Sequence, residues 1–284
     1  MQFTQKTVQC ISPSGLHRMA YTEWGVPDNP RVLVCVHGLT RNARDFDDLA
    51  RALSAHYRVV CPDVVGRGRS GRLRDPAHYG VPQYVADMVT LIARLNVDSV
   101  HWVGTSMGGL IGMALAAQEN SPIRRLILND VGPLITVDSL KRIGAYVGLD
   151  PTWATFGEAQ AYVRLISAPF GDLDEAQWHH LTESSIGQRA DGRWGFLYDP
   201  QIATPFKATF SEQDIDLWPL YQAIRCPTLA IRGAESDLLT RETWLQMGQC
   251  GPRAELAEIP GVGHAPMFLT QGQIDIARNF LLAA

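Results

Sequence analysis

Residues 100–109 read Val-His-Trp-Val-Gly-Thr-Ser-Met-Gly-Gly and carry the strongest signal in this chain of 284 residues. An apolar, β-rich run enters the segment, and a run of small, helix-compatible residues leaves it over positions 110–118. Ser106 therefore lies on a tight turn between a predicted strand and a predicted helix. Gly104 and Gly108 lie two residues to either side, where a Cβ atom would clash with the strained backbone of such a turn. The pattern predicts that Ser106 is a nucleophile at the positive N-terminal end of a helix.

Similar β-rich runs recur along the chain, with apolar residues at helical spacing between them. The strand-like runs are 31–36, 57–61, 99–103, 125–129 and 228–232. This alternation predicts an α/β fold in which a mostly parallel sheet is covered by helices on both faces. The opening segments 4–12 and 17–24 alternate polar and apolar residues, which favours an antiparallel start to the sheet.

The alternation stops between Gly132 and Trp218. This stretch is rich in aromatic residues, from Trp153 to Phe210, and carries several prolines that break helices. We interpret residues 132–218 as a mainly helical cap over one end of the sheet, inserted into a core domain of residues 1–131 and 219–284. Most of the aromatic side chains are expected to form the cap's own core, and a few to line a pocket.

The composition excludes several classes of protein. The formal net charge is −4 with no basic run, so neither nucleic acid nor an anionic membrane is an expected partner. No stretch approaches the roughly 20 apolar residues that span a bilayer, and the N-terminal residues do not resemble a secretory signal. The five cysteines are dispersed and include no Cys-x-x-Cys pair, which argues against a disulfide framework and a zinc site. A cytoplasmic location is the default expectation.

With its Gly-x-Ser-x-Gly turn between strand and helix, the chain resembles the α/β-hydrolase superfamily from about Arg31 to the C-terminus. The resemblance implies an eight-stranded, mostly parallel sheet with a cap. Residues 36–40, Val-His-Gly-Leu-Thr, are similar to the family's His-Gly loop. By this resemblance the backbone N–H groups of Leu39 and Met107 form the oxyanion hole, and His37 shapes the loop.

A second loop, residues 63–70, is similar to the family's Asp-x-x-Gly-x-Gly-x-Ser turn and also contains the letters of a dinucleotide motif. Gly66-Arg67-Gly68-Arg69-Ser70-Gly71 spells G-x-G-x-x-G. A dinucleotide site needs a helix to begin there, so that its N-terminus holds the pyrophosphate. A polar loop ending in Pro76 follows instead. We therefore expect no nucleotide cofactor, and the sequence indicates no other cofactor or metal.

A serine nucleophile needs a base and an acid that orients the base. His264, in a glycine-rich loop before the C-terminal helix, has flanks that resemble those of the family's base. The family places its acid at the position of Asp237, after the predicted strand 228–232, and this is the predicted acid. Glu235 and Asp130 are the rivals, the latter because it ends the strand after the nucleophile helix, where some family members carry their acid.

The predicted reaction is cleavage of small to medium carboxylic esters through an acyl-enzyme, with a small-molecule ester as partner. Ser106 argues against haloalkane dehalogenases and epoxide hydrolases, whose nucleophile is Asp. Carbon–carbon bond hydrolases share Ser-Met-Gly-Gly but often follow their base with Trp, where this chain has Ala265. Carbon–carbon hydrolysis, lactone hydrolysis and haloperoxidase-like chemistry stay open as alternatives. A ligand receptor with little turnover is the alternative of another class.

Overall fold

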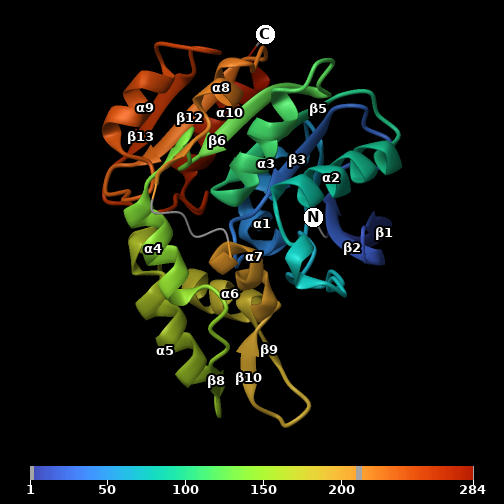
Figure 1. Ribbon diagram of the computed structural model, residues 1–284, viewed down its shortest axis with the longest axis vertical. Coiled ribbons are helices and arrows are strands. Elements are labelled where there is room, and N and C mark those ends of the chain that lie inside the picture. The colour runs from blue at the N-terminus through green and yellow to red at the C-terminus, as the bar shows by residue number, and fades with distance from the viewer. Residues whose placement is uncertain (1–2, 209–212, 284) are drawn as a thin grey trace.

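The computed structural model describes residues 3–208 and 213–283, with an eight-stranded sheet at its centre (Figure 1). The strand order is β1-β2-β4-β3-β5-β6-β12-β13. β1, β2 and β4 are antiparallel neighbours and the other pairs are parallel, which confirms the predicted mostly parallel sheet with an antiparallel start. The strands are β1 (Thr4–Ser12), β2 (Gly15–Trp24), β3 (Val32–Val36), β4 (Arg58–Pro62), β5 (Val100–Thr105), β6 (Ile123–Asn129), β12 (Thr228–Gly233) and β13 (Glu255–Ile259).

Helices cover both faces of this sheet. All five residues of β3 are buried, because alternate side chains enter opposite cores. Val34 packs in the core that includes apolar residues of α2 and α3, whereas Leu33 packs in the core that includes residues of α1 and α10. The helices and 3-10 turns of this part are η1 (Ala43–Phe46), α1 (Asp47–Leu53), η2 (Pro76–His78), α2 (Val81–Leu95), α3 (Met107–Ala116), α8 (Trp218–Gln222), α9 (Arg241–Met247) and α10 (Gln271–Leu282).

The chain between β6 and α8 forms a group of helices and short strands that lies beyond one end of the sheet, in the lower part of Figure 1. Its first and last strands pair with each other, Ile135 with Ile215, and so close the group at its base. The elements are β7 (Leu134–Ile135), α4 (Val137–Tyr146), β8 (Thr152–Trp153), α5 (Phe156–Ile166), η3 (Ala168–Phe170), α6 (Glu175–Ser185), β9 (Ile186–Gln188), β10 (Trp194–Phe196), η4 (Pro200–Ile202), α7 (Ala203–Ala208) and β11 (Ile215–Asp216). We call residues 132–218 the insertion; their separate status as a domain stays a prediction.

Local sequence explains where the insertion helices begin. The side chains of Thr136, Thr155 and Asp174 each accept a hydrogen bond from a backbone N–H in the first turn of α4, α5 and α6. Several aromatic side chains contact one another inside the insertion, as expected. The ring centroids of Trp153 and Phe196 are 5.2 Å apart, and the rings meet edge to face. Phe210, the last aromatic residue of the predicted cap, lies outside the described residues.

Among the helices of the described residues, none has both the length and the apolarity that crossing a bilayer requires.

Candidate active site

Ser106 lies on the predicted turn, directly after β5 and directly before α3. Its backbone has φ 52° and ψ −115°, a strained conformation for a residue with a Cβ atom. The glycines on either side are required by close backbone contacts. A Cβ atom on Gly104 would lie 2.2 Å from the Gly108 carbonyl oxygen, and one on Gly108 would lie 1.9 Å from that of Val36. The turn therefore packs directly against β3, which brings Ser106 beside the loop that follows this strand.

His264 follows β13 and lies against Ser106, as predicted. Its Nε2 is 3.0 Å from the Ser106 hydroxyl oxygen. The side chain is 20% exposed, so the ring is partly shielded from water. The N–H of Gly263, the preceding residue, donates to the carbonyl of Pro169 in the insertion (2.7 Å), which helps to fix the loop.

Asp130 is the carboxylate that contacts the histidine. Its Oδ2 is 2.7 Å from His264 Nδ1, and the side chain is fully buried directly after β6. Two further donors hold the carboxylate: the N–H of Gly233 to Oδ1 (2.8 Å) and the hydroxyl of Ser236 to Oδ2 (2.6 Å). Since a carboxylate oxygen only accepts, His264 carries its proton on Nδ1 and leaves Nε2 free to accept from Ser106.

The prediction that Asp237 orients His264 is wrong. The side chain of Asp237 is 57% exposed and forms an ion pair with Arg142 of α4. Its backbone carbonyl accepts from the Ser139 hydroxyl at 3.1 Å, which ties this turn to the insertion. The turn after β12 thus directs Asp237 away from His264, and Glu235 is exposed as well. The end of β12 and this loop instead supply the two further donors that hold Asp130, Gly233 and Ser236.

The N–H of Leu39 is oriented by its own peptide group. The carbonyl of Gly38 accepts from His37 Nδ1 at 2.7 Å. In a trans peptide the following N–H points the opposite way, so the N–H of Leu39 is directed away from the histidine ring. Among the described residues this N–H has no hydrogen-bond acceptor. A Cβ atom on Gly38 would lie 3.7 Å from the Cβ of Ser106, so the peptide is close to the candidate nucleophile.

His37 shapes this loop and stays neutral. Its ring is fully buried, with Nδ1 donating to Gly38 and Nε2 accepting from the N–H of Val64 at 3.0 Å. Burial lowers the pKa of His37 to about 3, and the positive charges of Arg67 and Arg41 act in the same direction. An uncharged ring with both nitrogens engaged has no proton to exchange with a substrate.

The N–H of Met107 likewise has no hydrogen-bond acceptor in the part of the chain that the structure describes. The carbonyl of Ser106 accepts from the N–H groups of Gly109 and Leu110, at 2.9 and 3.1 Å, in the first turn of α3. The N–H in that peptide therefore points out of the helix N-terminus, where backbone donors have no intrahelical partner. The structure thus brings the amides of Leu39 and Met107 to the turn that carries Ser106.

Two buried residues of the site have no clear signal in the sequence. Asn129, the last residue of β6, donates to the Thr105 hydroxyl (2.9 Å) and to the Pro266 carbonyl (2.7 Å). It therefore joins the strand before Ser106 to the loop of His264. Arg67 contacts both Leu39 and Met107. These contacts join segments far apart in the chain, so the local pattern around either residue could not indicate them.

The one group of side chains with metal-ligand character in the described residues is Cys10, His17 and Asp87, all buried. The ligand atoms lie within 4.8 Å of one another, but His17 Nε2 already hydrogen-bonds Asp87 at 2.9 Å. Burial raises the pKa of the Cys10 thiol to about 12, with Asp87 adding to the effect, so the thiolate that metals prefer is disfavoured. We interpret the group as a buried hydrogen-bonded contact between the β1–β2 hairpin and α2.

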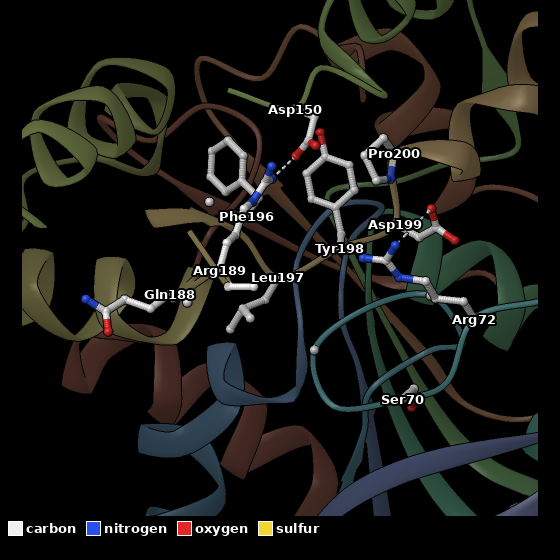
Figure 2. Close-up of a pocket in the computed structure, with 15 residues that line it drawn as sticks. Ser70, Arg72, Asp150, Gln188, Arg189, Phe196, Leu197, Tyr198, Asp199 and Pro200 are labelled. Atoms are coloured by element: carbon white, nitrogen blue, oxygen red, sulfur yellow. Dashed lines mark hydrogen bonds and ion pairs between the residues drawn. The ribbon is translucent and has the colours of Figure 1, made fainter. Parts of the chain in front are cut away.

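A cavity of about 460 Å³ lies between the loop after β4 and the insertion, and Ser106 does not line it (Figure 2). Figure 2 shows Arg189 paired with Asp150 on one side and Arg72 facing Asp199 on the other. Phe196 and Tyr198 contribute aromatic surface, so some aromatic residues of the insertion do line a cavity. Its mixed charges balance in pairs and select no particular ligand charge.

Comparison with known proteins agrees with this geometry. Residues 31–270 match a family described as alpha/beta hydrolase fold. A 3-hydroxybutyrate-oligomer hydrolase of Cupriavidus necator is 55% identical, over 98% of this chain and 97% of that protein. A 2-hydroxy-6-oxo-2,4-heptadienoate hydrolase of Pseudomonas putida is 29% identical over 90% of each. A solved alpha/beta hydrolase from Novosphingobium aromaticivorans has a TM-score of 0.87 at 36% identity, over 98% of both chains. The chain is therefore a hydrolase that belongs to the alpha/beta hydrolase fold family.

Proposed function

We propose that this hydrolase cleaves carboxylic esters of small to medium size through an acyl-enzyme intermediate on Ser106. The observation that carries the proposal is the continuous hydrogen-bonded chain from Asp130 through His264 to the Ser106 hydroxyl, with distances of 2.7 and 3.0 Å. A buried acid, an imidazole in the required tautomer and a serine on a helix N-terminus are the parts that acyl transfer needs.

In the first half of the reaction, Ser106 attacks the ester carbonyl while His264 Nε2 takes the hydroxyl proton. The carbonyl oxygen becomes an oxyanion, which accepts hydrogen bonds from the N–H groups of Leu39 and Met107. Each such donor contributes about 2.7–4 kcal/mol to lowering the barrier. The intermediate then collapses, the C–O bond to the alcohol breaks, and His264 returns its proton to the departing alkoxide.

In the second half, water replaces the alcohol. His264 takes a proton from this water as its oxygen attacks the acyl carbon, and the same two amides bind the second oxyanion. Collapse breaks the bond to the serine oxygen, which recovers the proton from His264. Throughout, Asp130 holds the ring in place and stabilises its positive charge without itself taking the proton.

The contacts of the insertion with the loops beside Ser106 support our proposal that the substrate is small to medium in size. The insertion is tied to the loop after β3, which carries Leu39, by the side-chain amide of Asn42, which donates to the Ser184 carbonyl at 2.6 Å. It is tied to the His264 loop by the contact between Gly263 and Pro169. Contacts on both sides of Ser106 restrict the approach of a bulky or aggregated substrate.

Short oligomers of 3-hydroxybutyrate are the substrate class that we favour. A relative with 55% identity over 98% of this chain carries that substrate in its name. Each link in such an oligomer is an ester between a carboxyl group and a secondary alcohol, which suits the proposed chemistry. The relative named for 2-hydroxy-6-oxo-2,4-heptadienoate favours carbon–carbon hydrolysis as the second candidate. The same serine would attack a ketone in that case.

Labelling and turnover test the proposal together. A serine-directed organophosphate should add one covalent equivalent at Ser106, located by peptide mass spectrometry, and Ser106→Ala should lose both labelling and activity. The assay panel contains the 3-hydroxybutyrate trimer, a nitrophenyl ester, a lactone and a vinylogous diketone. Fastest turnover of the two linear esters is expected. An Ala variant that keeps a substantial part of the wild-type rate would refute the serine mechanism. Fastest turnover of the diketone would favour the second candidate, and labelling without turnover of any substrate would favour a receptor.

A further inference from the structure

Arg67 is a fully buried cation close to the proposed oxyanion hole. It is 1% exposed and lies in the loop after β4. Its guanidinium donates to the carbonyls of Leu39 (Nε, 2.8 Å) and Val65 (Nη1, 2.7 Å) and to the hydroxyl of Tyr84 (Nη1, 2.9 Å). Nη2 contacts the sulfur of Met107 at 3.7 Å. Within the described parts of the chain, Arg67 forms no ion pair with a carboxylate. Burying a charge without a carboxylate partner is costly, and here it is offset by these hydrogen bonds and by the Tyr84 ring, whose centroid lies 5.0 Å from the guanidinium carbon.

Arg67 contacts Leu39 and Met107, the two residues whose backbone N–H groups form the proposed oxyanion hole. The guanidinium donates to the carbonyl of Leu39 and so fixes the peptide group after this residue. The peptide group before it, which contains the Leu39 N–H, is fixed by the hydrogen bond from His37 to the Gly38 carbonyl. Nη2 of the same guanidinium contacts the sulfur of Met107. A planar group with donors in fixed directions can hold these partners together, which a lysine ammonium on a flexible stem does less well.

The loop that carries Arg67 is itself held by the insertion. The residues on either side of it pair with the insertion backbone: Gly68 N–H donates to Leu197 (2.7 Å) and Asp199 N–H donates to Gly66 (2.7 Å). Arg67 and Tyr198 form an isolated antiparallel bridge between these contacts. The same stretch of the insertion lines the cavity of Figure 2. The backbone that carries the guanidinium is therefore held in place by the insertion as well as by the core.

We propose that Arg67 is a positioning residue for the oxyanion hole, an inference that rests on the proposed function. It holds Leu39 and Met107 so that their N–H groups converge, and its uncancelled positive charge favours the negative charge that develops on the substrate oxygen. Both effects act on the transition state more than on the neutral bound ester, so they lower the barrier with little effect on substrate affinity.

The test compares Arg67→Met with Arg58→Met. Arg58 is a largely buried arginine at the start of β4; it donates to Glu23 and to the Leu95 carbonyl, and among the described residues it has no side-chain hydrogen bond or ion pair with Ser106, His264, Asp130, Leu39 or Met107. We measure kcat and KM on a nitrophenyl ester and the affinity of a boronic acid, which forms an anionic tetrahedral adduct on Ser106. Loss of one direct oxyanion donor costs about 10²–10³ in kcat, so removal of a residue that positions two donors should cost about 10–100-fold.

Arg67→Met should lower kcat and boronate affinity by similar factors and change KM by less than about threefold. Arg67→Lys should recover part of both losses, because it keeps the charge. Arg58→Met should leave kcat and boronate affinity near wild type. Wild-type kcat in folded Arg67→Met, or a loss of kcat without a matching loss of boronate affinity, would overturn the proposal.

If Arg67→Met does not fold, Arg67→Lys carries the test against Arg58→Lys. It cannot reach all four partners, so kcat and boronate affinity should still fall, and wild-type values for both would overturn the proposal. Failure of the proposed function is a separate result, because the wild-type enzyme itself would then not turn over the nitrophenyl ester, whereas failure of the Arg67 proposal leaves wild-type ester turnover intact.

Discussion

Replacing Asp130 by Asn tests the identity of the acid, because the substitution changes the donors of the side chain and hardly its shape. The N–H of Gly233 donates to Oδ1 and cannot reverse its direction. The amide oxygen of Asn must therefore stay at that position, and the amide NH₂ takes the place of Oδ2, facing His264. His264 Nδ1 must then accept, which moves the ring proton to Nε2. In that tautomer the ring cannot take the proton of Ser106.

The expected loss in kcat follows from this tautomer. The equivalent change in a well-studied serine protease triad lowers kcat by about 10⁴, which corresponds to about 5 kcal/mol of barrier. We expect a loss of similar size for Asp130→Asn, with KM changed much less. Ser236, whose hydroxyl also faces Oδ2, can rotate to accept from the new NH₂, so the fold should survive.

Asp237→Asn is the matched control, since it removes the same charge from a residue that the structure places away from His264. Its ion pair with Arg142 is half-exposed, so its loss should cost less than about 1 kcal/mol of stability. We expect kcat within about threefold of wild type, because the side chain does not touch the hydrogen-bonded chain. The measurements are steady-state kinetics on a nitrophenyl ester and thermal unfolding of each variant. A folded Asp237→Asn with a large loss of kcat, together with an Asp130→Asn that keeps its kcat, would refute the assignment of the acid.

Three further predictions concern packing, pH and substrate length. Gly108→Ala should lower the free energy of unfolding by at least about 4 kcal/mol or prevent folding, because the new Cβ would lie 1.9 Å from a backbone oxygen. Gly157→Ala is the control, since its Cβ would meet no atom of another described segment within 4 Å, and it should be neutral or slightly stabilising. Urea unfolding measures both. Since the pKa of His37 is lowered from 6.5 to about 3 in the folded protein, the unfolded state binds more protons between these values, and stability must fall as pH falls. From pH 7.5 to 5 this contribution is about 2 kcal/mol, and His37→Gln should remove it from the pH dependence of the unfolding free energy; an unchanged dependence would contradict the neutral ring. In a chain-length series of nitrophenyl esters, rates should be highest for short to medium acyl groups and should not jump at the solubility limit; such a jump would indicate a lipase.

The sheet and the candidate nucleophile could be predicted from the sequence because their signals are local. The strand before Ser106, the helix after it and the glycines beside it all lie within a few residues of one another. The prediction for His264 is local as well, because it rests on immediate flanks that resemble those of the family's base. The roles of Asn129 and Arg67 could not be predicted, since each joins segments that only the folded chain brings together.

The acid was misplaced because two adjacent strands end at the same edge of the sheet. β6 and β12 are parallel neighbours, with Asn129 opposite Ile231, so a carboxylate after either strand begins close to His264. The distance along the chain after each strand decides between them. Asp130 follows the last residue of β6 directly and stays at the sheet edge. Asp237 lies four residues beyond Gly233, after a turn closed by Ser236 N–H on the Gly233 carbonyl at 2.9 Å.

The loop after β12 still takes part in the site, through its hydrogen-bond donors. A buried carboxylate is costly unless donors surround it, and Asp130 has three, of which Ser236 in this loop and Gly233 at the end of β12 supply two. The carboxylate that contacts His264 therefore lies on the strand whose neighbour supplies donors to it. In this chain the backbone N–H of Gly233 and the hydroxyl of Ser236 make that strand β6.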